Sequence, residues 1–440
     1  MGIYLGQIQC RYVLLRVECA PRRQIKQNGQ QKPSAVNPFE LDSRGEGRPL
    51  LQSVHGTGNV TRRAKCLLLS LMAPGKVVSW LVVATALAAC GGSNNSAGHS
   101  PSPAPGSAAP SASATAQPNA SPTPPPVTTP YGVLVGSQAA NSYSVSLVTI
   151  DGKVAATSEA STPPLVSCAN AAGAPVPLPV SMSNSRAYYM DAQGVVRFLA
   201  PSGEGGRATT VPAGTASRRS MFAVSPDDQR IAVIVNDYTS SGASTRLYVE
   251  DVNGGGNHLD LYTQSGARTL WPVGWHGNNN LVVAVVPSCT QGGGPFCCGI
   301  QELHVVDPAT AFRRFTIGAV TACPIVGPAS PSGAICWDGT NSKIINWTAG
   351  TVKTFPVSGP ESQLLSPNGG QVALVDNNGT AIQGSSVSMA GMFACTWIDD
   401  GHVLSGGDPQ HQPRIANIAN GSMIPVAAQG DCGGRLPGGL

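Results

Sequence analysis

The stretch Phe222–Val235 decides the fold, and it reads F-A-V-S-P-D-D-Q-R-I-A-V-I-V. An apolar strand runs into a Ser-Pro-Asp turn, and a second apolar strand rich in Val and Ile follows. Proline presets the backbone angle φ at the second turn position, and Asp tolerates the tight return. β-branched residues suit a pleated, half-buried surface. A second copy, L-L-S-P-N-G-G-Q-V-A-L-V-D, occupies Leu364–Asp376. The two copies indicate antiparallel hairpins built to one plan.

Looser copies of the same phrase place further turns near residues 183, 276, 331 and 399. Successive turns are roughly 30 to 55 residues apart, and repeats of about 40 to 50 residues with four short strands are typical of a β-propeller. Each sheet alone leaves its faces exposed, whereas a ring lets neighbouring sheets cover one another. We predict an all-β propeller of about seven four-stranded blades over residues 131–440. Six or eight blades are the alternatives, and a pair of β-sandwiches is the rival architecture.

The composition agrees with a turn-rich β protein that carries low-complexity segments. The chain has 440 residues with 52 Gly and 37 Pro, and only 11% are charged. Residues 1–89 hold 12 of the 27 Lys and Arg and 4 of the 23 Asp and Glu. The remaining residues then hold 15 basic and 19 acidic groups, so the rest of the chain is mildly acidic. Such a charge gives no electrostatic footprint for nucleic acid.

The N-terminal quarter has the layout of a secretory signal. Residues 1–71 show no sustained pattern, and we predict that they are a disordered or non-native leader. Residues 72–89 follow, with a short basic segment and then the predominantly apolar run Val77–Ala89, which is 13 residues long. A helix of that length spans about 20 Å, against about 30 Å for the hydrocarbon core of a bilayer. The segment therefore predicts a cleaved signal peptide rather than a permanent span.

The signal ends in Leu87-Ala88-Ala89-Cys90, which resembles the lipobox of bacterial lipoproteins. In that family the signal is cut before the cysteine, whose thiol carries a lipid. The resemblance implies that Cys90 is lipidated, with acyl chains such as palmitate anchoring the protein to the extracytoplasmic face of the cell membrane. An ordinary signal cut near Ala89, with Cys90 incidental, is the alternative.

Residues 90–130 follow the signal and contain the low-complexity repeats S-P-S-P-A-P and S-P-T-P-P-P. The segment lacks the apolar residues needed to offset the entropy of ordering, so we predict that it is disordered. Proline biases such a chain toward an extended form. We interpret it as a tether that holds the domain 131–440 away from the membrane.

The Ser-Pro-Asp/Asn phrase resembles the repeat of TolB-type and WD-like β-propellers. The likeness is good at residues 222–235 and 364–376 and loose elsewhere, and the His and Trp-Asp signature of true WD repeats is missing. It implies that loops at one end of the central channel bind partners.

Cysteine count predicts disulfides in an oxidising compartment. We expect pairs Cys323–Cys336 and Cys395–Cys432, the second joining the last blade to the C-terminal tail. A third pair would join Cys289 to Cys297 or Cys298. The eight candidate residues are Cys168, Cys289, Cys297, Cys298, Cys323, Cys336, Cys395 and Cys432. Spacing does not suit a zinc site at Cys297-Cys298.

No motif in the sequence names a reaction. A Gly-x-Ser-x-Gly elbow, a P-loop, a dinucleotide fingerprint and a His-Glu-x-x-His pair are all missing. One dense polar cluster has the residue types of a cation site or an acid/base pair, but we interpret it as a blade turn and a loop. It consists of Asp399, Asp400, His402, Asp408 and His411.

Other polar and aromatic residues also have a structural interpretation. We expect His276, Asp227 and Asp228 to be turn residues. The tryptophans are expected to pack within blades, although one or two of them would also suit a carbohydrate-binding face; they are Trp271, Trp275, Trp337, Trp347 and Trp397.

The sequence thus favours a lipid-anchored propeller that binds a protein or a ligand such as a glycan. We predict no catalytic residue, no cofactor and no metal. The rival hypothesis is a propeller enzyme, a glycan or peptide hydrolase or lyase with carboxylates at the channel mouth. A structural envelope component is a third.

Overall fold

The computed structural model describes residues 124–139, 141–166, 179–254, 256–288, 300, 302–358, 362–407 and 411–440. The expected leader, the signal, Cys90 and the tether up to residue 123 lie outside these residues. So do Cys168, Cys289, Cys297, Cys298 and Asp408. The described part contains no helix that is long and apolar enough to cross a bilayer.

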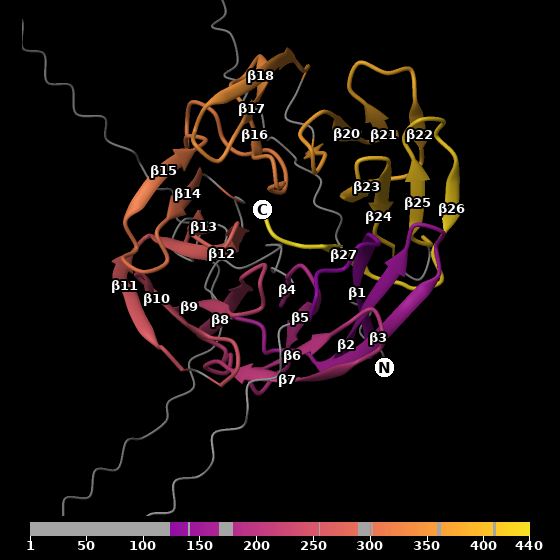
Figure 1. Cartoon of the computed structure of the whole chain (residues 1–440). Helices are drawn as coiled ribbons and strands as arrows, with labels where there is room; N and C mark the ends of the chain where they lie inside the picture. Colours follow the sequence, from indigo (N-terminus) through magenta and orange to yellow (C-terminus); the bar gives the residue numbers. More distant parts are fainter. Residues whose placement is uncertain are drawn as a thin grey trace, which may run out of the picture. The chain divides into compact units, whose positions relative to one another are not determined.

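The described residues form strands, which Figure 1 shows arranged as a ring of small sheets. In the first half of the chain they are β1 Tyr131–Ala139, β2 Ser142–Thr149, β3 Val154–Ser161, β4 Val180–Met182, β5 Ala187–Met190, β6 Val195–Leu199, β7 Gly205–Thr210, β8 Arg218–Val224, β9 Arg230–Thr239, β10 Gly242–Asp251, β11 Leu259–Gly266, β12 Arg268–His276 and β13 Asn280–Pro287. In the second half they are β14 Glu302–Val306, β15 Arg313–Ile317, β16 Ala334–Trp337, β17 Asn341–Ile345, β18 Thr351–Pro356, β19 Ser362–Leu365, β20 Val372–Asp376, β21 Gly379–Ile382, β22 Ser388–Ala390, β23 Ala394–Asp399, β24 His402–Ser405, β25 Arg414–Asn417, β26 Met423–Pro425 and β27 Asp431–Leu436.

Seven antiparallel sheets make up the ring, which confirms the predicted propeller and the blade number ranked first. We number the blades along the chain: blade 1 is β27-β1-β2-β3, blade 2 is β4-β5-β6-β7, blade 3 is β8-β9-β10-β11, blade 4 is β12-β13-β14-β15, blade 5 is β16-β17-β18, blade 6 is β19-β20-β21-β22 and blade 7 is β23-β24-β25-β26.

The two ends of the described chain close the ring in blade 1. The last strand, β27, is its innermost strand and pairs antiparallel with the first strand, β1. In the other blades a turn joins the innermost strand to the second one. Blade 1 has no such turn because these two strands come from opposite ends of the described chain. This explains why the sequence shows six copies of the turn phrase for seven blades.

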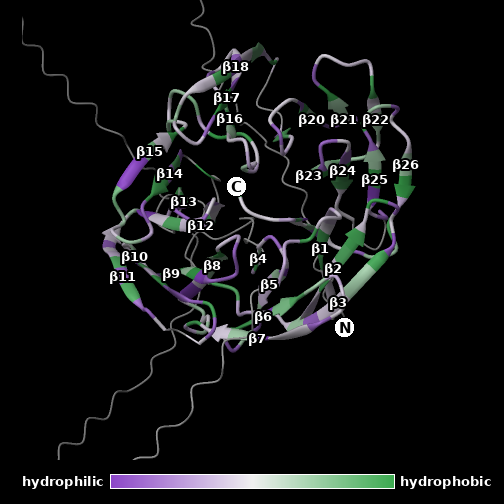
Figure 2. Ribbon diagram, viewed as in Figure 1, coloured by the Kyte–Doolittle hydropathy of each residue, from purple (hydrophilic) through white to green (hydrophobic). Residues whose placement is uncertain are grey.

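Hydrophobic side chains fill the boundaries between blades. The described core divides into seven main clusters, and each cluster joins two neighbouring blades. On β9, Ile231 and Val233 pack toward blade 2, whereas Ala232 and Ile234 pack toward blade 4. Successive side chains of a strand point to opposite faces. Both faces of β9 are buried, and this is why the deciding stretch reads I-A-V-I-V without polar alternation. The equivalent strand β13 is similarly hydrophobic (Figure 2).

Blade 5 departs from the predicted four strands, because only three are regular. A short inner segment takes the place of the fourth: Ile325 bridges Cys336, and the amide of Val326 donates to the carbonyl of Ile335 at 3.0 Å. Pro324 has no amide hydrogen for a regular ladder. A disulfide between Cys323 and Cys336 attaches the segment to β16.

The two cysteine pairs chosen from the sequence are both present. Besides Cys323–Cys336, a disulfide joins Cys395 of β23 to Cys432 of β27. The second pair links blade 7 to the strand that closes blade 1. The cross-link therefore reinforces the one place where the ring depends on the pairing of chain segments distant in sequence.

Candidate functional site

The innermost strands surround a central channel with a free volume of about 380 Å³. The lining residues described come from β4, β8, β12, β23 and β27, from the chain that follows β27, and from residues outside the strands, namely Pro179, Ile300, Pro328, Ala329 and Pro331. Arg435 is the one ionisable side chain among them, since Cys395 and Cys432 are joined as a disulfide. Burial lowers the pKa of Arg435, and this effect outweighs the negative charges of Asp400 and Asp399, which raise it. The described wall of the channel is thus mainly apolar and holds no Asp or Glu side chain.

Residues that follow β27 lie in the channel, and the C-terminal label stands at the centre of the ring in Figure 1. The amide of Gly438 donates to the carbonyl of Ser183 at 2.6 Å, and the amide of Leu440 donates to the carbonyl of Trp275 at 2.7 Å. The ring nitrogen Nδ1 of His276 donates to the carbonyl oxygen of Leu440, also at 2.7 Å. The segment therefore binds blades 2 and 4 along the inner rim.

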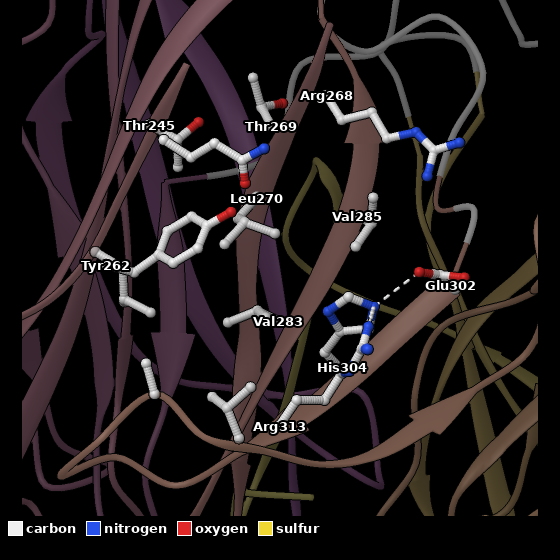
Figure 3. A pocket seen from close by; sticks show the side chains of 14 residues that line it. Thr245, Tyr262, Arg268, Thr269, Leu270, Val283, Val285, Glu302, His304 and Arg313 are labelled. Carbon is white, nitrogen blue, oxygen red and sulfur yellow. Dashed lines mark hydrogen bonds and ion pairs between the residues drawn. The ribbon is translucent and has the colours of Figure 1, made fainter. Parts of the chain in front are cut away.

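A second cavity, of about 470 Å³, lies between blades 3 and 4, and we call it the interblade cleft (Figure 3). Facing side chains of the two sheets build it. It is lined by Thr245 and Leu247 of β10, Tyr262 and Gln264 of β11, Arg268, Thr269 and Leu270 of β12, Val283 and Val285 of β13, Glu302, His304 and Val306 of β14, Ala311, and Arg313 of β15.

One wall of the interblade cleft carries four ionisable side chains. Glu302 and His304 are two residues apart on β14, so they share a face of the strand. Oε1 of Glu302 is 2.7 Å from Nε2 of His304. Figure 3 shows the guanidinium of Arg268 on one side of this pair and that of Arg313 on the other. The Nη1 atom of Arg313 is 3.3 Å from Nε2 of His304.

Electrostatics keep His304 neutral at neutral pH. Burial lowers the pKa of His304, the hydrogen bond and charge of Glu302 oppose this, and the charge of Arg313 adds to the lowering. The net pKa is below the ordinary value of 6.5. At pH 7 the wall then carries two guanidinium charges against one carboxylate. Across the cleft, burial raises the pKa of Tyr262, so its hydroxyl stays protonated.

Asp399, Asp400 and His402 of the polar cluster chosen from the sequence lie at the turn between β23 and β24, as interpreted, whereas Asp408 lies outside the described residues. Nδ1 of His402 is 2.9 Å from Oδ1 of Asp399, and that oxygen also accepts the amide of Gly401 at 2.8 Å. Asp400 accepts the amide of Asn368 in the neighbouring blade at 2.9 Å. His411 lies exposed after the undescribed residues 408–410. No group of three His, Cys, Asp or Glu within the described ranges is placed to hold a metal.

The other polar candidates have structural roles, and one of them does more than form a turn. Asp227 accepts the hydroxyl of Ser225 at 2.5 Å within the turn between β8 and β9. Asp228 is buried and accepts hydrogen bonds from Ser185 at 2.5 Å and Tyr188 at 2.8 Å, both in blade 2. Asp228 therefore joins two blades.

Three tryptophans are buried between blades, as their interpretation as packing residues requires. The indole NH of Trp275 donates to Ala223 at 3.0 Å, and that of Trp397 donates to Leu364 at 2.9 Å, each in the preceding blade. Trp347 is also buried. Trp271 lines the channel and Trp337 is half-buried.

Sequence reasoning missed the interblade cleft. Within β14, the alternation E-L-H places Glu302 and His304 on one face of the strand. That signal was present in the sequence. The approach of Arg268 and Arg313 was not, because it depends on how blade 4 pairs its outer and inner strands.

No protein-family model matches the chain, and no curated protein sequence matches it. Several solved structures are similar at low identity. BamB from Moraxella catarrhalis has a TM-score of 0.33 and 14% identity, over 71% of this chain and 84% of that chain. An oligogalacturonate lyase in complex with manganese has a TM-score of 0.31 and 11% identity, over 65% and 70%.

An acylaminoacyl peptidase from Pyrococcus horikoshii has a TM-score of 0.37 and 9% identity, over 67% of this chain and 52% of that chain. Two of these three proteins, the lyase and the peptidase, are named as enzymes, whereas the name of BamB states no activity. Similarity this low carries no argument about function, so the site must be judged on its own geometry.

Proposed function

We propose that the protein is an extracytoplasmic binding protein, anchored to the membrane by a lipid on Cys90, whose ligand binds in the interblade cleft. The single observation that carries the binding role is the cleft itself. Its volume of about 470 Å³ lies in the range of small-molecule sites. The cleft combines an apolar floor, formed by Leu270, Val283 and Val285, with a few polar groups on its walls. The anchor rests on the lipobox-like end of the signal, and the low-complexity tether gives the propeller reach.

The distribution of carboxylates favours binding over glycoside hydrolysis. Hydrolysis of that kind generally uses two carboxyl groups about 5 to 10 Å apart. Glu302 is the one side-chain carboxylate among the described residues that line the cleft, and the described channel wall has no side-chain carboxylate. The carboxylates expected at the channel mouth for a propeller enzyme are therefore not among these lining residues.

One observation favours the enzyme hypothesis as a second candidate. The Glu302–His304 pair places a neutral imidazole, oriented by a carboxylate, on the wall of a cavity. Such a pair suits proton transfer in a glycan or peptide lyase or hydrolase. Turnover of polymeric glycans or peptides by the native protein, lost in Glu302→Gln with binding retained, would establish this function in place of simple binding.

The anchor is tested by Cys90→Ala in the native host. The native protein is expected in the membrane fraction, labelled by a palmitate analogue, whereas the variant should lose the label. A labelled Cys90→Ala protein would overturn the assignment of Cys90.

Ligand binding in the cleft is tested with a variant that fills it. Gln264 is exposed at the rim of the cleft, so Gln264→Trp should block it without altering the core. Thr354→Trp, on the exposed face of β18, is the matched control. Small molecules that raise the melting temperature of the native protein should do so for the control and not for Gln264→Trp. Equal shifts in both variants would place binding elsewhere.

A further inference from the structure

We infer that the ligand of the interblade cleft is an organic anion, with one anionic head group held by Arg268 and Arg313 and an apolar body lying on the floor. This inference rests on the proposed function, since it names the ligand class of the same site. It follows from the hydrogen-bonding capacity of the charged wall, the balance of charge on it and the composition of the floor.

Arg313 lies beside His304 on the wall of the cleft. With Glu302 ionised, Nε2 of His304 must carry a hydrogen to donate to the carboxylate at 2.7 Å. The same nitrogen then has no lone pair for Nη1 of Arg313, although the two atoms are 3.3 Å apart. The guanidinium of Arg313 thus stands beside His304 without being satisfied by it. Its donors can be used by an acceptor that enters the cleft.

Arg268 is the first residue of β12. Its side chain is exposed at the cleft, and no hydrogen bond or ion pair to another described residue is observed for it. Figure 3 shows its guanidinium extending past Val285 to the side of the Glu302–His304 pair opposite Arg313. A group placed before this wall would face a guanidinium on each side.

Charge on the wall selects an anion. Two guanidinium groups face one carboxylate, and that carboxylate is already engaged by His304. Guanidinium groups bind carboxylates and related oxyanions through short, charge-assisted hydrogen bonds, which are about twice as strong as neutral ones. Glu302 stands between the two arginines and repels a second negative charge. The wall therefore suits a single anionic head group better than a polyanion.

The apolar floor of the cleft favours a ligand whose body is also apolar. Figure 3 shows Leu270, Val283 and Val285 between the charged wall and the ring of Tyr262, and these three side chains form the floor of the cleft. An apolar body placed there would cover these side chains and gain the free energy of their removal from water. A small inorganic anion would leave them uncovered. The site accordingly fits a molecule with an apolar ring or chain and one acidic group.

The test compares 2-naphthoate with its uncharged isostere 2-naphthamide by calorimetry. The native protein is held in phosphatidylcholine nanodiscs, and empty nanodiscs serve as the blank. Naphthoate should bind one to one and at least tenfold more tightly than naphthamide. Arg268→Gln and Arg313→Gln should each weaken naphthoate binding about tenfold and leave naphthamide binding unchanged. Arg414→Gln, which removes an exposed arginine on β25, should change neither.

The outcomes separate the two proposals. Equal binding of the two probes, abolished by Gln264→Trp, would overturn the anion inference and leave the cleft as a ligand site. Binding of neither probe, or binding that survives Gln264→Trp, would count against the proposed function itself. Unchanged urea midpoints for both arginine variants show that a loss of binding is not a loss of fold.

Discussion

Leu134, on the first strand of the ring, pairs with Cys432, on the last. Cys432 is in turn disulfide-bonded to Cys395 of blade 7. The closing strand β27 is thus held on one side by the backbone ladder of β1 and on the other by a covalent bond to the neighbouring blade. Ring closure is otherwise the pairing of two segments about 300 residues apart, which is costly in chain entropy.

Removal of this cross-link should loosen the closure. Cys395→Ser/Cys432→Ser opens a loop of 37 residues, and the chain-entropy model gives a loss of about 4 kcal/mol in the free energy of unfolding. Amide hydrogen exchange in β1 should accelerate. Cys323→Ser/Cys336→Ser, whose loop is 13 residues, is the matched control and should accelerate exchange in blade 5 instead. Unchanged exchange in β1 for the first variant would contradict the assigned role.

The segment that follows β27 should stabilise the inner rim. A Cβ atom at Gly438 would lie 2.6 Å from the backbone of Met182, which cannot move aside as a flexible side chain could. Gly438→Ala should therefore lower the free energy of unfolding by about 1 to 3 kcal/mol, the usual effect of overpacking. Urea unfolding measures it. Gly266→Ala, where the added atom meets nothing within 4 Å, should be close to neutral. Equal effects would show that the segment contributes little.

Asp228 should matter far more to stability than its neighbour Asp227. The carboxylate of Asp228 is 5% exposed and accepts the hydroxyls of Ser185 and Tyr188 across the boundary between blades 2 and 3. Asp228→Ala leaves both hydroxyls without that partner and places alanine at a φ of 59°, so we expect a loss of about 3 kcal/mol. Asp227→Ala should cost about 1 kcal/mol, since it removes hydrogen bonds within an exposed turn. Urea midpoints of the two variants compare them directly.

The contrast between these two residues shows what the sequence could predict. The Ser-Pro-Asp phrase identified the turn, its position and the propeller, because turn chemistry and apolar strands are local properties. It did not reveal that one of two adjacent aspartates reaches into another blade. The closing strand, D-C-G-G-R-L, was missed because two glycines and two charges read as a loop. It is a strand because β1 supplies its ladder, and the disulfide to Cys395 was the one sequence signal of that contact.

The interblade cleft could not be predicted from the sequence for a related reason. Its residues come from six strands and a turn of two blades. Alternation within one strand links pairs such as Glu302 and His304, but no local pattern links one strand to another. Prediction of the remaining contacts requires the register of β12 and β15 in the sheet. The fold could therefore be predicted from the repeated turn phrase. The cleft could not, because it forms where the side chains of blade 3 face those of blade 4.

His304 provides a pH test of the cleft geometry. Its pKa in the folded protein is below 6.5 chiefly because of burial, so the neutral form is favoured by folding. The stability that results is fully present above pH 6.5 and is lost as the pH falls through the folded-state pKa. His304→Gln should reduce the loss of stability between pH 6.5 and pH 5. Urea unfolding at several pH values and the NMR titration of the imidazole measure the effect.

His258 is a control because its pKa is shifted in the opposite direction to that of His304. The hydrogen bond that Nδ1 of His258 donates to Glu250 raises the pKa of His258, so its contribution is present below pH 6.5 and is lost as the pH rises through the folded-state pKa. The imidazole is 44% exposed, and solvent screening keeps that contribution small. A His304 resonance that titrates at or above 6.5 would mean that the hydrogen bond and charge of Glu302 outweigh burial, and the expected loss of stability between pH 6.5 and pH 5 would then be absent.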